Sequence, residues 1–323
     1  TALGYLTLNA QNLTTATDSN NVAVGYLAGT AVTTGINNTL IGGLAGDALA
    51  DADNNTAVGK SALSADTLGS NSTAIGRKAL GTQNFTTATD AYNTAVGAFA
   101  GEAVTTGVQN TLIGGLSGDA LTVGNKNISI GYRTLSADTK GNKNVAVGNF
   151  ALSTQNFTTA TDVFNVGVGH GAGEGITTGV KNNLLGGLAG DALTVGGENV
   201  AIGTSALTTD TKGSHTVAIG TGALETQNFT TATDANNTAV GHAAGNAITT
   251  GTENTLIGTL AGDALTDADK NVAIGYFSLT TDTLGSKSVA IGNGALGAQN
   301  FTTATDTFNT AVGQEAGRFV TTG

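Results

Sequence analysis

The chain has 323 residues, of which 49 are Gly, and it contains no Pro, Cys, Met or Trp. The absence of cysteine excludes disulfide scaffolds, cysteine nucleophiles and thiolate metal sites. The 12 basic and 23 acidic residues give a net charge of −11 with no Lys/Arg cluster, so contact with nucleic acid or with an anionic membrane is not expected. No run of 18 apolar residues occurs, so no membrane-spanning helix is predicted.

One pentapeptide, written NTAVG, NTLIG or NVAIG, recurs eighteen times along the chain. Its final glycine stands at positions 4, 25, 42, 59 and 76, and one long step followed by three short ones then repeats. A 17-residue unit is therefore nested in a 72-residue unit, and such a fixed period indicates a supersecondary element that buries its apolar face by stacking on its neighbours. We interpret the chain as one continuous repeat domain. Its parts are a partial unit at 1–20, four 72-residue units at 21–92, 93–164, 165–236 and 237–308, and a partial unit at 309–323.

The pentapeptide has the pattern of a short β-strand. The residue before its glycine is always aliphatic, and the residue two positions earlier is mostly Thr or Val, which suits one face of an extended chain. The residue between them is usually Ala, and we expect it to point to the opposite, outward face. We predict an all-β fold, a parallel β-solenoid with short and long (17/21-residue) rungs stacked about 4.8 Å apart.

The first position of the pentapeptide is Asn at 14 of 17 places from the second rung onward. Asn tolerates the left-handed conformation at a corner and can form hydrogen bonds with its counterparts in adjacent rungs. We favour a structural ladder over a ligand site at these positions. The ladder begins with Asn21, Asn38, Asn55, Asn93, Asn110, Asn127, Asn144 and Asn165.

The octapeptide QNFTTATD lengthens one rung in four by four residues and is therefore expected to bulge from the stack. Its phenylalanine is either a local anchor, which we favour, or part of a multivalent binding array. Its Asn-Phe-Thr sequence also has the form of an N-glycosylation site. The loop residues concerned are Asn84, Phe85, Asn156, Phe157, Asn228, Phe229, Asn300 and Phe301.

No constellation of catalytic or metal-binding residues interrupts the repeats. The closely spaced carboxylates Asp51 and Asp53 could bind Ca²⁺, but a solvated turn is the favoured interpretation because the middle copies lack them. We therefore expect no enzymatic activity, no catalytic residue, no metal and no cofactor.

The sequences SVAIG at 288–292, NVAIG at 199–203 and TVAIG at 216–220 resemble the head repeats of YadA-type trimeric autotransporter adhesins. Similar repeats are found in bacteriophage tail fibres. The resemblance implies a left-handed β-roll and a homotrimer in which three rolls pack around a threefold axis. The small middle residues Ala23, Ala57 and Ala95 would allow that close approach, with Leu at the same position once in every 72-residue unit. A single three-sided solenoid stays open as the alternative.

These observations predict an extracellular structural fibre, the shaft or head of an adhesin at a cell surface or of a phage fibre at a virion surface. The expected partners are further copies of the chain in a homotrimer or a longer filament, and surface glycans or a host receptor. An alternative function is multivalent glycan or surface binding through the QNFTTATD loops. Because the sequence begins and stops within repeat units, we expect the parent chain to continue.

Overall fold

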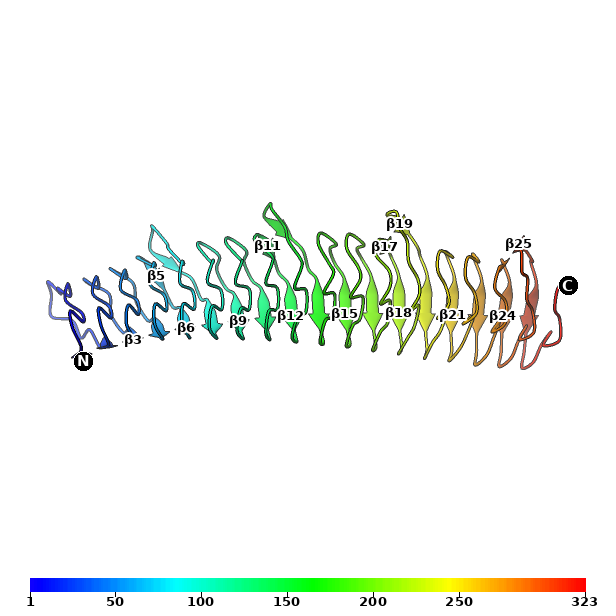
Figure 1. The fold of residues 1–323 in the computed structure, drawn as a ribbon, viewed down its shortest axis with the longest axis horizontal. Coiled ribbons are helices and arrows are strands. Elements are labelled where there is room, and N and C mark those ends of the chain that lie inside the picture. Colours follow the sequence, from blue (N-terminus) through cyan, green and yellow to red (C-terminus); the bar gives the residue numbers. More distant parts are fainter. The chain divides into compact units, whose positions relative to one another are not determined.

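The computed structural model describes all 323 residues, Thr1–Gly323, which form short strands and turns without any helix. It comprises two compact units, Thr1–Phe164 and Asn165–Gly323. Within each unit the chain coils and the successive strands stack on one another (Figure 1). The predicted all-β solenoid of parallel strands is confirmed in both units.

The first unit contains a stack of nine strands and two smaller pairs. The stack consists of β1 (Ala2–Leu3), β2 (Val22–Val24), β3 (Thr39–Ile41), β4 (Thr56–Val58), β6 (Thr73–Ile75), β8 (Thr94–Val96), β9 (Thr111–Ile113), β10 (Ile128–Ile130) and β12 (Val145–Val147). The pairs are β5 (Gly69–Ser70) with β7 (Thr89–Asp90), and β11 (Gly141–Asn142) with β13 (Thr161–Asp162).

The second unit repeats this plan. Its stack consists of β14 (Val166–Val168), β15 (Asn183–Leu185), β16 (Val200–Ile202), β18 (Val217–Ile219), β20 (Thr238–Val240), β21 (Thr255–Ile257), β22 (Val272–Ile274), β24 (Val289–Ile291) and β26 (Thr310–Val312). Its smaller pairs are β17 (Gly213–Ser214) with β19 (Thr233–Asp234), and β23 (Gly285–Ser286) with β25 (Thr305–Asp306).

The pairing register reproduces the sequence period. Thr39 of β3 lies opposite Thr56 of β4, one short rung further along the chain. Thr73 of β6 lies opposite Thr94 of β8, one long rung further along the chain. Equivalent residues of consecutive rungs therefore lie next to each other, and the predicted rung lengths are confirmed.

The prediction that the middle residue of each strand points outward is wrong. The middle residue of each strand faces the interior: Ala23, Ala57 and Ala95 are completely buried, as are the leucines that replace alanine once in each 72-residue unit. The flanking residues face outward instead, and Ile41 is 39% exposed. Those leucines are Leu40, Leu112, Leu184 and Leu256.

The narrowness of each rung explains this orientation. A Cβ atom added at Gly46 would lie 2.7 Å from Leu40 Cδ2, so the opposite wall has no room for a second side chain where the middle residue is Leu. One rung later the middle residue is Ala57, and the position equivalent to Gly46 is Leu63, which is completely buried. In these two rungs leucine thus fills the interior from one wall or from the other, and the β-branched side chains of the strands are left outside.

The glycine that ends each pentapeptide is required by the stacking itself. Gly42 has a φ of +133°, and a Cβ atom there would lie 2.6 Å from the carbonyl oxygen of Gly59 in the next rung. Gly59 makes the same approach to Gly76, where the corresponding distance is 2.5 Å. Any side chain at these positions would separate neighbouring rungs.

Exchanging the sizes of the side chains at Leu40 and Gly46 tests whether the two positions share one space in the interior. Leu40→Ala should lower the free energy of unfolding by about 2–5 kcal/mol, and Gly46→Leu should also destabilise the protein because of its clash with Leu40. The double variant L40A/G46L places alanine and leucine as at Ala57 and Leu63, although Leu49 Cδ1 also lies 2.8 Å from the Cβ position of Gly46. We therefore expect its loss of stability to be smaller than the sum of the two single losses. Urea denaturation followed by circular dichroism measures this, and additive losses in the double variant would contradict a shared space.

Candidate functional site

The outward side chains of the strand stack form an uncharged surface in each unit, which we call the aliphatic face. It has two rows, the first and the third residues of the three-residue strands. In the first unit these are Val22, Thr39, Thr56, Thr73, Thr94, Thr111, Ile128 and Val145, and Val24, Ile41, Val58, Ile75, Val96, Ile113, Ile130 and Val147. In the second unit they are Val166, Asn183, Val200, Val217, Thr238, Thr255, Val272, Val289 and Thr310, and Val168, Leu185, Ile202, Ile219, Val240, Ile257, Ile274, Ile291 and Val312.

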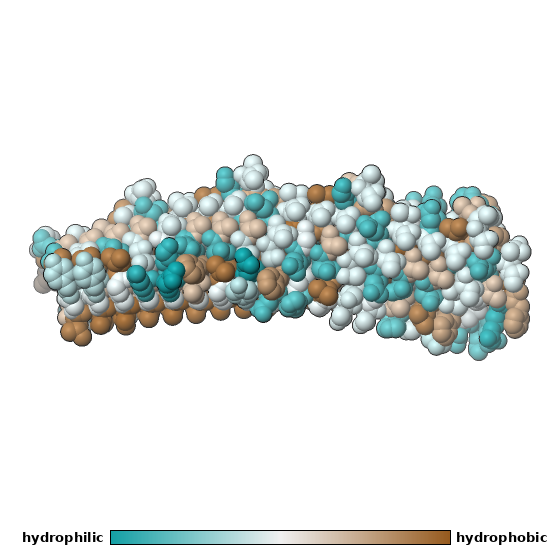
Figure 2. Space-filling view, viewed as in Figure 1, coloured by the Kyte–Doolittle hydropathy of each residue, from teal (hydrophilic) through white to brown (hydrophobic).

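The third-residue row exposes large aliphatic side chains to solvent. Ile41, Ile75 and Ile113 in the first unit and Leu185 and Ile257 in the second are all 37–39% exposed. Figure 2 shows hydrophobic side chains in a continuous row along the lower edge of the N-terminal part of the chain. Contiguous exposed apolar surface is a common feature of interaction sites, so this face is the candidate site of the chain.

The asparagine ladder is buried, and its amides form hydrogen bonds between consecutive rungs, although Asn144 Oδ1 has no partner. The backbone N–H of Asn38 donates to Asn21 Oδ1 at 2.8 Å, and that of Asn55 donates to Asn38 Oδ1 at 2.9 Å. Asn38 Nδ2 donates to the carbonyl of Ala52 at 2.7 Å. Asn38 therefore makes three connections. Its backbone N–H bonds to the preceding ladder asparagine, its Oδ1 bonds to the start of the next strand, and its Nδ2 bonds to the turn before that strand.

The same bonds recur at the other ladder positions that the sequence singled out. The backbone N–H groups of Asn110, Asn127 and Asn144 each donate to the preceding ladder asparagine, and Asn93 and Asn165 donate through Nδ2 to the carbonyls of Gly107 and Gly179. The left-handed conformation expected at these asparagines lies one residue earlier, at Asn37 and Asn54 for example.

A second buried polar network fixes the QNFTTATD loop of the first 72-residue unit. Asp66 is completely buried, and its Oδ1 accepts hydrogen bonds from the backbone N–H groups of Gly69 at 3.0 Å and Phe85 at 3.1 Å. Its Oδ2 accepts from Gln83 Nε2 at 2.6 Å. Gln83 Oε1 in turn accepts from Asn93 Nδ2 at 2.8 Å, which joins the loop to the asparagine ladder.

This network contains a residue that the sequence analysis did not identify. Asp66 recurs as Asp138, Asp210 and Asp282, always one short rung before the loop glutamine, and each accepts a bond from that glutamine. The recurrence in every 72-residue unit was the available signal. The bond itself depends on the stacking of two rungs, which brings the aspartate beside the glutamine.

The loop residues proposed from the sequence divide into buried rings and more accessible amides. Phe85, Phe157 and Phe229 are 5–8% exposed and Phe301 is half-buried, so the rings pack inward as anchors do. Asn84, Asn156 and Asn300 are exposed and Asn228 is half-buried. The side-chain oxygens of these asparagines accept hydrogen bonds from Thr67, Thr139, Thr283 and Thr211, respectively.

The exposed part of each loop is its threonine-rich tip. The hydroxyl of Thr67 donates to Asn84 in the next rung, and these two residues are 17 positions apart, as in a short rung. Gly69, only two residues after Thr67, pairs with Thr89, which is five residues after Asn84. The extra residues of the long rung therefore lie between Asn84 and Thr89. The additional residues at this point are Thr86, Thr87 and Ala88, and all three are exposed. The loops extend beyond the neighbouring coils (Figure 1).

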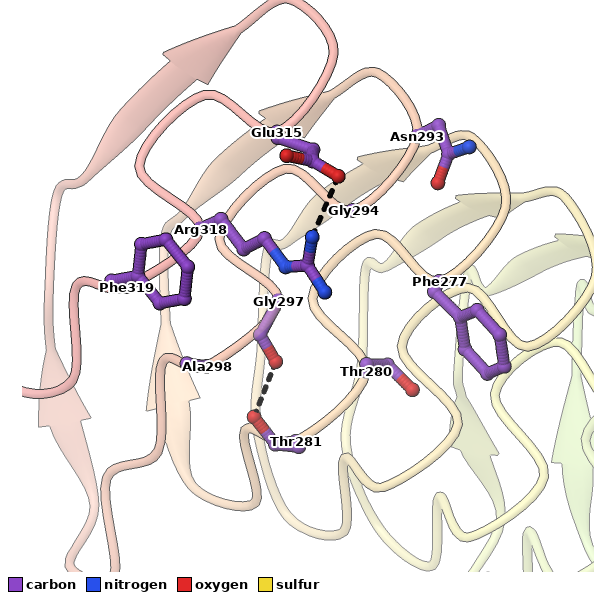
Figure 3. Close-up of a pocket in the computed structure, with 10 residues that line it drawn as sticks. All are labelled: Phe277, Thr280, Thr281, Asn293, Gly294, Gly297, Ala298, Glu315, Arg318 and Phe319. Carbon is purple, nitrogen blue, oxygen red and sulfur yellow. Dashed lines mark hydrogen bonds and ion pairs between the residues drawn. The ribbon is translucent and has the colours of Figure 1, made fainter.

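A hollow of about 420 Å³ lies in the second unit (Figure 3). Phe277 and Phe319 stand on opposite sides of it, with Gly294 and Gly297 between them. Arg318 is engaged in an ion pair with Glu315 at 2.6 Å. Gly294, one of the lining residues, is equivalent to Phe150 of the second 72-residue unit.

The carboxylates considered for Ca²⁺ serve turns. Asp51 accepts a hydrogen bond from the Thr34 hydroxyl at 2.6 Å, and Asp53 accepts one from the backbone N–H of Ile36 at 2.7 Å. No group of three or more His, Asp or Glu side chains lies close enough together to hold a metal ion. The structure also contains no helix long and apolar enough to cross a membrane.

The pH dependence of stability should report the buried Asp66 carboxylate. Burial raises the pKa of Asp66 above its ordinary value, although its hydrogen bonds act in the opposite direction. The carboxyl group therefore contributes stability that is present below the unfolded-state pKa and is lost as the pH rises through the folded-state pKa. We expect the stability of Asp66→Asn relative to the unmodified protein to increase as the pH rises from about 3 to 7.

Asp162 provides the control of opposite sign. The hydrogen bond from Lys143 lowers the pKa of this exposed carboxyl group, so its contribution is lost as the pH falls. The stability of Asp162→Asn relative to the unmodified protein should therefore decrease as the pH rises. Chemical denaturation at several pH values measures both differences, and equal slopes for the two variants would contradict the assignment.

No protein-family model and no curated protein matches this chain.

Proposed function

We propose that the chain is part of an extracellular structural fibre that associates laterally through its aliphatic face. The observation that carries this proposal is the aliphatic face itself, two rows of outward side chains without a charged residue in either unit. Burial of apolar surface contributes about 25 cal/mol per Å², and the contributions of successive strands add because the rows are continuous. A second copy presenting the same face is the partner that matches it along its length.

The proposed assembly is a homotrimer of left-handed rolls. The resemblance of the pentapeptides to the head repeats of trimeric adhesins supports it, and a closed cyclic arrangement would bury the aliphatic face of all three copies around one axis. Because the middle alanines of the strands are buried, they cannot form the surface on which neighbouring rolls pack. In the proposed trimer the exposed third residues of the strands form that surface instead. Attachment at a cell surface and projection from a virion remain two settings for the same fibre.

The interior of the chain also suits a structural role. Both buried networks join consecutive rungs, and side-chain hydrogen bonds to buried backbone groups hold the register of the stack. A fibre of such coils resists local opening because each rung is hydrogen-bonded on both sides.

Charges on the aliphatic face should abolish assembly. Ile75→Lys combined with Ile113→Lys should convert the trimer to monomers, because burial of two ammonium groups in each copy is strongly unfavourable. Analytical ultracentrifugation measures the assembly state, and circular dichroism checks the fold. As a control, Thr204→Lys with Thr221→Arg adds two positive charges outside the aliphatic face and should leave the trimer intact. An unmodified protein that sediments as a monomer would contradict the proposal.

A second candidate function is surface or glycan binding through the loop tips. The exposure of Thr86, Thr87 and Ala88, at the same place in every long rung, supports it. Deleting these three residues and their equivalents from all copies should preserve the trimer, because the residues lie outside the paired strands. If the fibre alone mediates attachment, the deletion variant should still bind cells. Loss of cell binding by an intact deletion trimer would instead favour the loop candidate.

A further inference from the structure

Three basic side chains surround one small hollow in the first unit. Lys60, Ser61, Arg77 and Lys78 line a space of about 290 Å³. Lys60 and Arg77 occupy equivalent positions of consecutive rungs, and the backbone N–H of Lys78 donates to the carbonyl of Lys60 at 3.0 Å. The stacking of rungs therefore brings together three of the 12 basic residues of an acidic chain.

The hollow has an excess of positive charge. Lys78 Nζ forms an ion pair with Glu102 at 2.7 Å. Arg77 has no carboxylate partner, and its guanidinium carbon lies 4.5 Å from the centroid of the Phe99 ring, which orients it. Lys60 has no ion-pair partner either. Three cations thus face one carboxylate, and Lys60 and Arg77 remain available.

The scaffold does not need these charges. The positions of Lys60, Arg77 and Lys78 are occupied in the third 72-residue unit by Thr204, Thr221 and Gly222, which belong to the same kind of stacked rung. The residue type at these positions differs between units while the backbone stacking is the same. The stacking therefore does not require lysine or arginine there.

A second basic hollow in the same unit provides a contrast. Lys126 and Lys143 line a space of about 440 Å³ together with Asp162. Lys143 is paired with Asp162 at 2.6 Å, and this carboxylate also lies close enough to Lys126 for its pKa to be lowered. The carboxylate of Asp162 therefore offsets the positive charge of that hollow.

We propose that the hollow at Lys60 and Arg77 binds a sulfate or phosphate ester carried by a polysaccharide. Arginine presents planar paired donors to a tetrahedral oxyanion, and lysine adds a point charge, so the two side chains together match one such group. The volume of about 290 Å³ is just below the range for drug-sized ligand pockets, about 300–1,000 Å³, which suits one charged group on a sugar ring. None of the lining residues belongs to the aliphatic face, so the site is independent of the proposed assembly.

The overall acidity of the chain limits the attraction to short range. A net charge of −11 repels polyanions at a distance, but charges separated by more than about 8 Å are largely screened at physiological ionic strength. Binding should therefore depend on the three local cations rather than on the field of the whole protein.

The test compares two variants that each remove two positive charges. K60T/R77T introduces the residues found at Thr204 and Thr221, whereas K126N/K143N introduces those found at Asn54 and Asn71. Binding of the full chain to immobilised dextran sulfate and to phosphorylated dextran, in about 150 mM salt, is measured by biolayer interferometry. Uncharged dextran and phosphatidylglycerol vesicles are the comparison ligands, and thermal unfolding checks each fold.

We expect the unmodified chain and K126N/K143N to bind at least one of the two charged dextrans, and to lose it to competing inorganic sulfate or phosphate. K60T/R77T should bind at least about tenfold more weakly. Arg77→Lys, which keeps the charge but loses the paired donors, should show an intermediate loss. The proposal is overturned if the unmodified chain binds neither charged dextran, if both double variants lose binding equally, or if only the lipid vesicles are bound.

Discussion

The close approach of the two walls of each rung is the constraint on which the rest of the structure depends. Between the middle strand residue and the facing position of the opposite wall it leaves room for at most one leucine, which is Leu40 with Gly46 facing it or Leu63 with Ala57 facing it. The stacking of the rungs separately excludes any side chain from Gly42, which lies against the backbone of the next rung. The β-branched residues of the strands therefore have no place inside, and the outward aliphatic face is a direct consequence of the narrow interior.

A narrow apolar interior provides limited hydrophobic stabilisation, and buried polar networks supply order in addition to it. The amide of Asn38 bonds to its own rung and to the following rung, and Asp66 joins a turn to the base of the next loop. Buried polar groups are tolerated when all their hydrogen bonds are made, and such networks then specify one arrangement. A shift of one rung relative to the next would break all these bonds together, so the polar residues fix the register.

Comparison of the repeat units distinguishes the residues that the stacked fold requires from those that it only tolerates. Residues that recur in every rung, such as the pentapeptide glycine, are explained by stacking. Residues that appear in one unit alone, such as Lys60 and Arg77, have no such explanation, and their positions accept threonine elsewhere in the chain. The repeated surface of the fibre and its local chemistry are thus carried by different residues: the outward strand rows recur with the fold, and the charged hollow does not.

The sequence by itself determined the strands, their parallel order and their register. Each pentapeptide is a β pattern ended by glycine, and the regular spacing of the pentapeptides places equivalent strands beside each other, as Thr39 and Thr56 show. Only the tertiary structure decided which side of the strand is buried. Thr, Ala and Ile in one strand offer apolar groups on both faces, so the choice depends on the distance to the opposite wall. The network of Asp66 and Gln83 likewise exists only after stacking, because the two side chains belong to different rungs and the fold brings them to within 2.6 Å.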